Sequence, residues 1–283
     1  MLASPTLMRQ SARLTTDERG EEPAVARLQT EISPRDPGTH PSLGVLRDIK
    51  RGGVACSTCG LREICFAAVL GTDTLCQIDN LVNVRSRLQK GATLFHVGDH
   101  FKSLYAIRSG SCKTVSLSED GHDQVSGYHM PGEIIGTDGI GTDTHGCRAV
   151  ALEDTEVCTL PLDRIEALGR QNVSFQHNFH RLLAQEISRE RTVMLLLGTM
   201  HAEQRLAIFL LDLSQRYAAR GYSASEFVLR MTRDEIGSYL GLKLETVSRL
   251  FSRFQRDGLV QLQGRAVKLL DRVSLRRIIA CRD

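Results

Sequence analysis

A change of sequence texture near residue 162 constrains the fold of this chain more than any other feature. Between residues 91 and 162, short β-type runs alternate with turns that contain glycine. The clearest runs are residues 93–95, 104–107, 113–117 and 156–160, and the turns are Gly98-Asp99, Ser109-Gly110, Asp120-Gly121 and Pro131-Gly132. Many short strands at this spacing predict an antiparallel barrel or jelly roll. After residue 162 the apolar period becomes helical, so we expect an α+β chain with an N-terminal β-roll.

The helical half begins with one long helix, which we expect over residues 169–200. Apolar residues recur at i, i+3, i+4 and i+7 from Phe175 to Leu197, and they include Ile187 and Met194. A helix of this length with a narrow apolar stripe is typical of dimerisation, although packing on the chain's own barrel gives the same pattern. Glu190 lies in line with the stripe. There it would face its twin across a two-fold axis and make dimerisation weak and easily switched.

The C-terminal third has the charge and pattern of a nucleic-acid-binding domain. Residues 201–283 hold 15 Lys and Arg against 9 Asp and Glu, although the net charge of the whole chain is only +3. Within this third, residues 233–251 have the pattern of a helix-turn-helix, because Gly237 lets two helices approach closely and Gly241 makes the turn between them. Thr232 followed by Glu235 predicts a capping box at the start of the first helix.

The second helix of this pattern, expected over residues 244–256, has the features of a recognition helix. Its outward face near the N-terminus presents Glu245, Ser248 and Arg249, whose side chains can hydrogen-bond base edges in the major groove. Basic side chains that would lie nearer the phosphates are Lys243, Arg253 and Arg256. Residues 259–262 and 267–270 resemble a two-stranded wing around Gly264. We therefore predict a C-terminal winged helix-turn-helix domain over residues 201–283.

Three cysteines lie close together near the N-terminus. Cys56, Cys59 and Cys65 have the spacing C-x2-C-x5-C. Closely spaced thiolates hold iron–sulfur clusters or zinc, and redox-active or inert thiols are the remaining interpretation. The spacing does not identify a fourth ligand, for which five cysteines are available: Cys76, Cys112, Cys147, Cys158 and Cys281.

The rest of the chain sets the broad class. Residues 1–45 contain five of the seven prolines and no apolar period, so we expect a disordered N-terminal extension. Residues 71–88 have the period of a short helix. The chain has no run of eighteen apolar residues and no export signal near its start, which predicts a soluble protein in the reducing cytoplasm. Ser, His and Asp occur in no recognisable catalytic frame, so we expect no enzyme.

Taken together, these segments resemble the FNR branch of the CRP/FNR superfamily, the oxygen-sensing fumarate and nitrate reduction regulators of bacteria. The order of cysteine loop, β-roll, long helix and winged helix-turn-helix is that of the superfamily. Residues 102–110 (KSLYAIRSG), 231–237 (MTRDEIG) and 244–250 (LETVSRL) look like the FNR branch. The resemblance extends from about Gly52 to the C-terminus and does not include the N-terminal extension.

The resemblance implies a sensor domain over residues 46–168 that holds a [4Fe–4S] cluster. In the family, three loop cysteines and one cysteine of the β-roll bind the cluster, and the matching positions are Cys56, Cys59, Cys65 and Cys158. Cys147 is the rival for the fourth position. The resemblance tells against a cyclic nucleotide, because residues 132–138 offer no basic residue for a phosphate and Asp138 would repel one.

The resemblance also implies the partners of the chain. Dimerisation would involve Ile187, Glu190 and Met194, and the base-reading residues Glu245, Ser248 and Arg249 would recognise an inverted repeat of TTGAT-like half-sites. The turn at residues 118–123 corresponds to a region that contacts RNA polymerase, although a solvated hairpin is an equal interpretation. The expected function is an oxygen-responsive regulator of anaerobic-metabolism genes that dimerises without oxygen. The alternatives are a zinc-stabilised regulator with another effector and an iron–sulfur electron-transfer protein.

Overall fold

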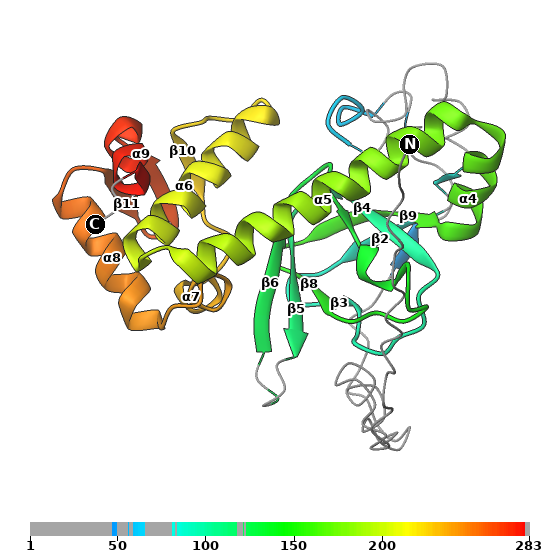
Figure 1. Cartoon of the computed structure of the whole chain (residues 1–283), viewed down its shortest axis with the longest axis horizontal. Coiled ribbons are helices and arrows are strands. Elements are labelled where there is room, and N and C mark those ends of the chain that lie inside the picture. The colour runs from blue at the N-terminus through cyan, green and yellow to red at the C-terminus, as the bar shows by residue number, and fades with distance from the viewer. Residues whose placement is uncertain are drawn as a thin grey trace, which may run out of the picture. The chain divides into compact units, whose positions relative to one another are not determined.

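The computed structural model describes residues 47–49, 56, 59–65, 81–82, 84–117, 121 and 123–280, and for residues 47–49 it describes the backbone alone. The predicted N-terminal extension, Cys76 and Cys281 therefore lie outside the described residues. The described chain folds as the predicted α+β architecture, in which a β-roll, a long helix and a C-terminal helix-turn-helix domain follow one another (Figure 1).

Two antiparallel sheets form the described β-roll. Their strand orders are β1-β2-β9-β4-β7 and β3-β8-β5-β6. The strands are β1 (Arg47–Ile49), β2 (Val84–Leu88), β3 (Thr93–Phe95), β4 (Ser103–Ser109), β5 (Cys112–Leu117), β6 (Asp123–His129), β7 (Ile134–Ile135), β8 (Arg148–Ala151) and β9 (Thr155–Pro161). Glycines at the predicted turns, such as Gly98 and Gly110, have positive φ, which is why the chain reverses there. The predicted strands within residues 93–160 are confirmed.

The predicted helix over residues 71–88 is wrong at its C-terminal end. Residues 71–80 lie outside the described residues and Leu81 is helical, but Val84–Leu88 is strand β2. The segment alternates, with Ser86 and Leu88 buried and Arg87 between them exposed, and it pairs with β9 along its whole length. The apolar positions of this segment fit a period of two as well as a helical period, and pairing with the sheet selects the strand.

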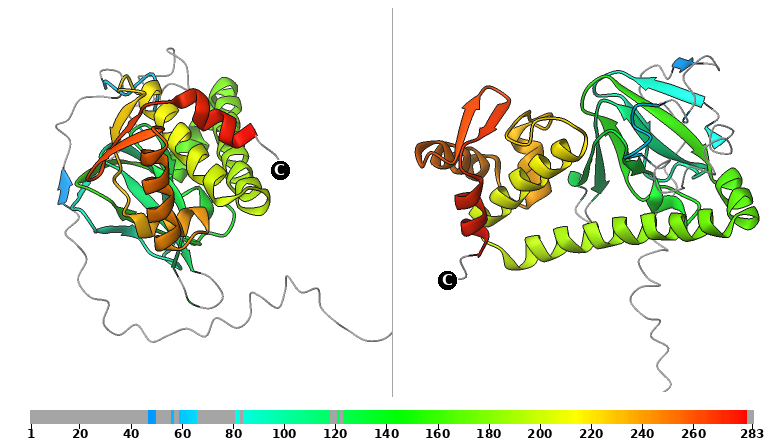
Figure 2. Two further views of the ribbon diagram at one scale, coloured as in Figure 1. Left: turned by 90° about the vertical axis from the view of Figure 1, so that its left-hand side faces the viewer. Right: turned by 90° about the horizontal axis from the view of Figure 1, so that it is seen from above.

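Two helices follow the roll. Helix α4 (Leu162–Gln171) ends at Asn172, whose extended backbone breaks the helical run and whose side chain accepts a hydrogen bond from the Phe175 backbone amide. Helix α5 (Val173–Thr199) then runs past the roll to the C-terminal helices (Figure 2). The capped break at Asn172 means that residues 169–171 of the predicted long helix belong to α4 instead.

The C-terminal domain begins after Met200, the residue that follows α5. Its elements are α6 (Ala202–Ala219), β10 (Glu226–Val228), α7 (Arg233–Leu240), α8 (Leu244–Arg256), β11 (Val260–Gln263), β12 (Ala266–Leu269) and α9 (Arg272–Ala280). The predicted wing is present as β11 and β12, with β10 added to its edge. Arg205 of α6 donates hydrogen bonds to the carbonyl oxygens of Leu197 (2.7 Å), Met200 (2.9 Å) and Leu240 (3.0 Å), so it ties the C-terminal ends of α5 and α7 together.

Candidate metal centre and nucleic-acid interface

The four predicted cluster ligands meet in one pocket. The loop residues Cys56, Cys59 and Cys65 line it together with Cys158 of β9, which lies more than ninety residues later in the chain. The loop is compact, since the Cys59 amide donates to the Cys56 carbonyl (3.1 Å) and the Cys65 amide donates to the Leu61 carbonyl (2.8 Å). The alternation of β9 buries Val157 in one core cluster and places Cys158 beside another. All four cysteines are half-buried.

The remaining walls of this cysteine pocket are apolar and basic. Apolar walls come from side chains that include Val82, Ala106 and Leu160, and basic groups come from Arg62, Arg85 and Arg108. Burial raises the pKa of the Cys158 thiol, and the nearby Arg85 and Arg108 guanidinium groups lower it by a smaller amount. Among the described residues, no three His, Cys, Asp or Glu side chains lie close enough to hold a single metal ion.

Cys147, the rival for the fourth position, lies elsewhere. It is buried in the core cluster that contains Ile107 and Val157, apart from the cluster that adjoins Cys56, Cys65 and Cys158. The Cys147 thiol donates to Asp138 Oδ2 at 3.4 Å, and burial, followed by the charge of Asp138, raises its pKa. The structure therefore brings Cys158, rather than Cys147, to the loop cysteines.

Sequence reasoning missed Arg85 and Arg108, two of the three arginines that line the cysteine pocket. Arg85 lies directly opposite Cys158 in the register of β2 and β9, and Arg108 of β4 forms an ion pair of 2.7 Å with Glu156. The signal existed only for Arg85, since assigning residues 84–88 to a strand instead of a helix would have placed it on the sheet beside β9. Arg108 had no local signal, because its neighbours in the pocket come from distant segments.

The helix-turn-helix is built as the sequence predicts. Gly241 adopts the left-handed conformation with φ of 62°, and a Cβ atom on Gly237 would lie 2.5 Å from the Leu242 carbonyl oxygen, so only glycine allows this close approach. Thr232 and Glu235 form the predicted capping box, with reciprocal hydrogen bonds of 3.2 and 2.6 Å to each other's backbone amides. The capping box therefore fixes the start of α7, and the two glycines fix its turn into α8.

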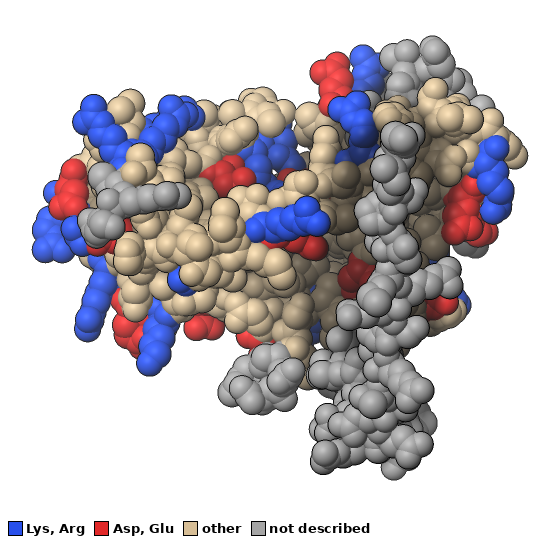
Figure 3. All heavy atoms as spheres, viewed as in Figure 1, with Lys and Arg blue, Asp and Glu red and all other residues tan. Residues whose placement is uncertain are grey.

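Helix α8 presents the predicted base-reading face. Glu245 and Arg249 are exposed and Ser248 is half-buried, while Val247 and Phe251 pack inward. Lys243 is the exposed residue before the first turn of the helix, and Figure 3 shows basic side chains projecting around α8, with acidic ones among them. Arg253 forms ion pairs with Glu203 and with Asp257 (3.6 Å). A phosphate contact by Arg253 would therefore have to replace these carboxylates.

The predicted apolar stripe of α5 is buried against the roll in its N-terminal part and exposed at several positions further along. Its N-terminal part packs on the roll, where Phe175 is fully buried and Phe179 and Leu182 adjoin the same core cluster. Ile187 and Met194 are instead exposed, by 50% and 72%, and Glu190 is exposed near them. Large exposed apolar side chains on one helix indicate a surface that a partner covers. Packing on the chain's own barrel thus accounts for the first half of the stripe only.

Two family models match this chain. The Crp-like helix-turn-helix domain matches residues 204–278, and the cyclic nucleotide-binding domain, which has the β-roll fold, matches residues 85–172. None of the described helices combines the length and the apolar character needed to cross a bilayer.

The chain is also similar to known regulators over most of its length. It is 47% identical over 224 residues to the transcriptional regulatory protein btr of Bordetella pertussis, a match that covers 79% of this chain and 93% of the relative. It is 41% identical over 231 residues to the fumarate nitrate reduction regulatory protein of Klebsiella oxytoca, covering 81% and 92%. The solved structure of FixK2 from Bradyrhizobium japonicum matches with a TM-score of 0.65 and 28% identity, covering 70% of this chain and 98% of that one.

A β-roll joined by one long helix to a winged helix-turn-helix defines a class of DNA-binding transcription regulators. This chain belongs to the FNR branch of the CRP/FNR superfamily of bacterial transcription regulators, whose members bind DNA through the helix-turn-helix and act as dimers.

Proposed function

We propose that this regulator responds to oxygen through a [4Fe–4S] cluster held by Cys56, Cys59, Cys65 and Cys158. One observation carries the proposal: three thiols of the N-terminal loop and one thiol of β9 line a single pocket. The donor set fits the group, because thiolates are the ligands that such clusters take and because the adjacent Arg85 and Arg108 offset the negative charge of the centre. When bound, the cluster supplies an oxygen-sensitive link between the loop and the sheet.

This link between the loop and the sheet would control dimerisation through helix α5. With the loop held against β9, the turn that precedes β7 and the adjoining face of α5 are fixed, and the exposed Ile187 and Met194 become the dimer surface. Glu190 beside them opposes association, so a small change at the loop suffices to shift the equilibrium. A difference of about 1.4 kcal/mol changes a dimerisation constant tenfold. The dimer then places two α8 helices on an inverted repeat of TTGAT-like half-sites.

We expect that no cyclic nucleotide controls this regulator. The cavity of about 310 Å³ beside the second sheet is lined by the acidic residues Asp138, Glu186 and Glu190. Its basic residue, Arg189, already forms ion pairs with Glu133 and Glu186. Asp138 lines this cavity, and its carboxylate accepts hydrogen bonds from the Gly146 (2.8 Å) and Cys147 (3.1 Å) amides. A carboxylate in this position would repel an incoming phosphate. A contact of residues 118–123 with RNA polymerase stays a prediction, since only Gly121 and Asp123 of that turn are described.

The test compares two cysteine variants purified without oxygen. Cys158→Ala should lose most of its iron and acid-labile sulfide, remain a monomer and bind the inverted repeat at least about tenfold more weakly than the unmodified protein. Cys112→Ala is the matched control, because Cys112 is fully buried in β5 and lies outside the cysteine pocket. It should keep its iron and its DNA affinity.

Cys147→Ala separates the remaining outcomes. If Cys158→Ala keeps its iron and Cys147→Ala loses it, the ligand assignment is wrong. If all proteins carry about one zinc and no sulfide, the zinc-stabilised regulator replaces the oxygen sensor.

A further inference from the structure

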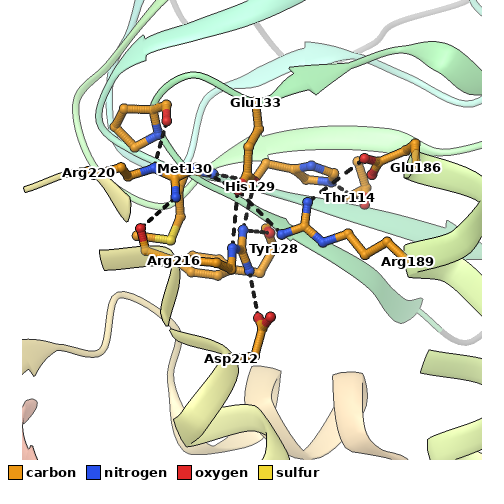
Figure 4. Close-up of polar contacts among 11 residues, drawn as sticks. Thr114, Tyr128, His129, Met130, Glu133, Glu186, Arg189, Asp212, Arg216 and Arg220 are labelled. Atoms are coloured by element: carbon orange, nitrogen blue, oxygen red, sulfur yellow. Dashed lines mark hydrogen bonds and ion pairs between the residues drawn. The ribbon is translucent and has the colours of Figure 1, made fainter. Parts of the chain in front are cut away.

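A carboxylate that is only 15% exposed joins the roll to both long helices. Glu133 lies in the turn between β6 and β7, and one of its oxygens accepts from Arg189 of α5 at 3.3 Å (Figure 4). Arg216 of α6 binds both oxygens, at 3.1 and 2.7 Å, and Arg220 of α6 donates at 2.6 Å. Glu133 also accepts from the Met130 amide at 3.0 Å. One carboxylate thus holds three guanidinium groups from two helices.

The charges of this Glu133 cluster make it a firm connection. Burial acts to raise the pKa of Glu133, but Arg216, Arg189 and Arg220 together outweigh burial and hold the pKa well below its ordinary value. The side chains of Arg216 and Arg220 are only 11% and 7% exposed. Both also donate to backbone carbonyls of the segment before Glu133, Arg216 to Tyr128 (2.6 Å) and Arg220 to Pro131 (2.7 Å). Loss of the Glu133 carboxylate would remove the ion pair of Arg220 and would leave Arg216 with Asp212 (3.3 Å) as its carboxylate partner, a costly change for side chains so little exposed.

The cysteine loop touches this same turn. Gly132 immediately precedes Glu133, and a Cβ atom there would lie 2.9 Å from the carbonyl oxygen of Ile64, the neighbour of Cys65. Gly132 has φ of 90°, a conformation that favours glycine. The Gly132 and Glu133 backbones also exchange hydrogen bonds of 2.7 and 2.9 Å with Ile107, whose neighbour Arg108 lines the cysteine pocket. The turn is therefore fixed from two sides by groups that adjoin the thiols.

We propose that Glu133 is the residue that transmits the state of the cysteine loop to α5 and α6. The proposal rests on the proposed function only in taking the loop as the sensor. A displaced loop would release Gly132, shift the Glu133 carboxylate and loosen its bonds to Arg189 on one helix and to Arg216 and Arg220 on the other. The same movement thus reaches the dimer helix and the first helix of the DNA-binding domain. Glu133 is a positioning residue, since it contacts neither the thiols nor the recognition face.

Other contacts between the roll and the C-terminal domain lie away from the loop. Lys113 pairs with Glu235 at 2.6 Å, and Arg230 pairs with Glu153 at 3.2 Å. Neither pair includes a residue that lines the cysteine pocket or a hydrogen-bond partner of Glu133. They join the roll to the C-terminal domain through other side chains, so they supply matched controls.

The test is a thermodynamic cycle in the full-length protein, read by hydrogen exchange of the α6 amides with mass spectrometry. Cys65→Ala perturbs the loop, Glu133→Gln removes the carboxylate charge at nearly constant volume, and a third protein combines both changes. We expect Cys65→Ala to raise α6 exchange about fivefold or more in the presence of Glu133, and by less than about twofold in the Glu133→Gln protein. Equal factors in the two backgrounds would overturn the proposal.

Control variants guard against a merely structural effect. Glu153→Gln breaks the ion pair to Arg230, and in this background Cys65→Ala should keep its whole effect on α6; loss of the effect here would contradict the assignment to Glu133. Arg189→Gln serves if Glu133→Gln does not fold, because Arg189 is 31% exposed. It should remove the effect of the loop on α5 and leave the effect on α6. An unchanged effect on α5 would exclude the route through Glu133.

Iron and sulfide are counted on the same samples to separate the two proposals. If the protein contains iron and Cys65→Ala raises α6 exchange equally with and without the Glu133 carboxylate, the oxygen-sensing function stands and the role of Glu133 is refuted. If the protein contains no iron but the two increases in α6 exchange differ, Glu133 stands as the coupling residue and the oxygen-sensing function is refuted.

Discussion

His129 lies at the buried end of β6 in the neutral form. Its Nε2 atom is 3.1 Å from the Thr114 hydroxyl, and its Nδ1 atom has no hydrogen-bond partner within the described part of the chain. Burial lowers the pKa of His129 to about 4, and the nearby Arg189 and Arg216 add to this while Glu133 opposes it. The unfolded chain, with an ordinary His pKa, therefore binds more protons than the folded chain between about pH 6.5 and 4.

Folding stability should accordingly fall as the pH is lowered through this window. Between pH 7 and 5 the loss from His129 is about 2 kcal/mol, because the unfolded state gains the proton. Urea unfolding at the two pH values measures it. His129→Gln, which keeps a hydrogen-bonding group near Thr114, should lose about that much less on acidification. An identical pH dependence in the two proteins would mean that His129 is not held neutral by the fold.

Arg249 is the residue on which base selectivity should depend most. Its side chain is exposed on the N-terminal half of α8, where a guanidinium can form two hydrogen bonds to guanine. Arg249→Ala should reduce the free energy of binding to a TTGAT-like inverted repeat by about 1–3 kcal/mol. It should change binding little on a duplex whose G·C pairs are exchanged. Fluorescence anisotropy at one fixed salt concentration compares the two duplexes. Equal weakening on both would show a phosphate contact, the behaviour expected of Arg256→Ala.

At the scale of elements, the turn of the helix-turn-helix depends on a glycine that cannot be replaced. Gly237→Ala would bring a methyl group within 2.5 Å of the Leu242 carbonyl, so the turn after α7 must shift. We expect a loss of about 1–3 kcal/mol in the free energy of unfolding, measured by urea denaturation. Gly141→Ala is the control, because a Cβ atom there meets nothing within 4 Å. A stable Gly237→Ala protein would contradict the packing of α7 on α8.

The elements predicted correctly are those whose signals are local. Thr232, Glu235, Gly237 and Gly241 specify the start of α7 and its turn into α8 within ten residues, so the sequence alone predicted them. Strand β2 was not predicted, because its short apolar run fits both a helical period and a period of two, and only pairing with β9 decides between them. The end of α4 at Asn172 was likewise missed, since a capping residue inside a continuous apolar pattern is a weak local signal.

At the scale of the whole molecule, the contacts that couple domains were beyond sequence reasoning. Glu133 binds Arg189, Arg216 and Arg220, which follow it in the chain by 56, 83 and 87 residues. A single acidic residue in a turn gives no sign of such distant partners. The cysteine pocket was only partly predictable for the same reason. The loop spacing identified Cys56, Cys59 and Cys65, whereas Cys158 came from the family resemblance and its place in the pocket came from the sheet.

The dimer is the state through which these contacts would act on DNA. Ile187 and Met194 are large apolar side chains left exposed on α5, and a second copy of the chain is the partner that would cover them. The Glu133 cluster would join this surface to the cysteine pocket, so occupancy of the pocket and assembly must change together.

One measurement tests that claim most directly. The protein is purified without oxygen, its iron and acid-labile sulfide are counted, and its size is determined by chromatography before and after exposure to air. We expect about four irons and four sulfides per chain, and a dimer that dissociates in air as the iron is lost. About one zinc per chain, no sulfide and a size that air does not change would contradict it.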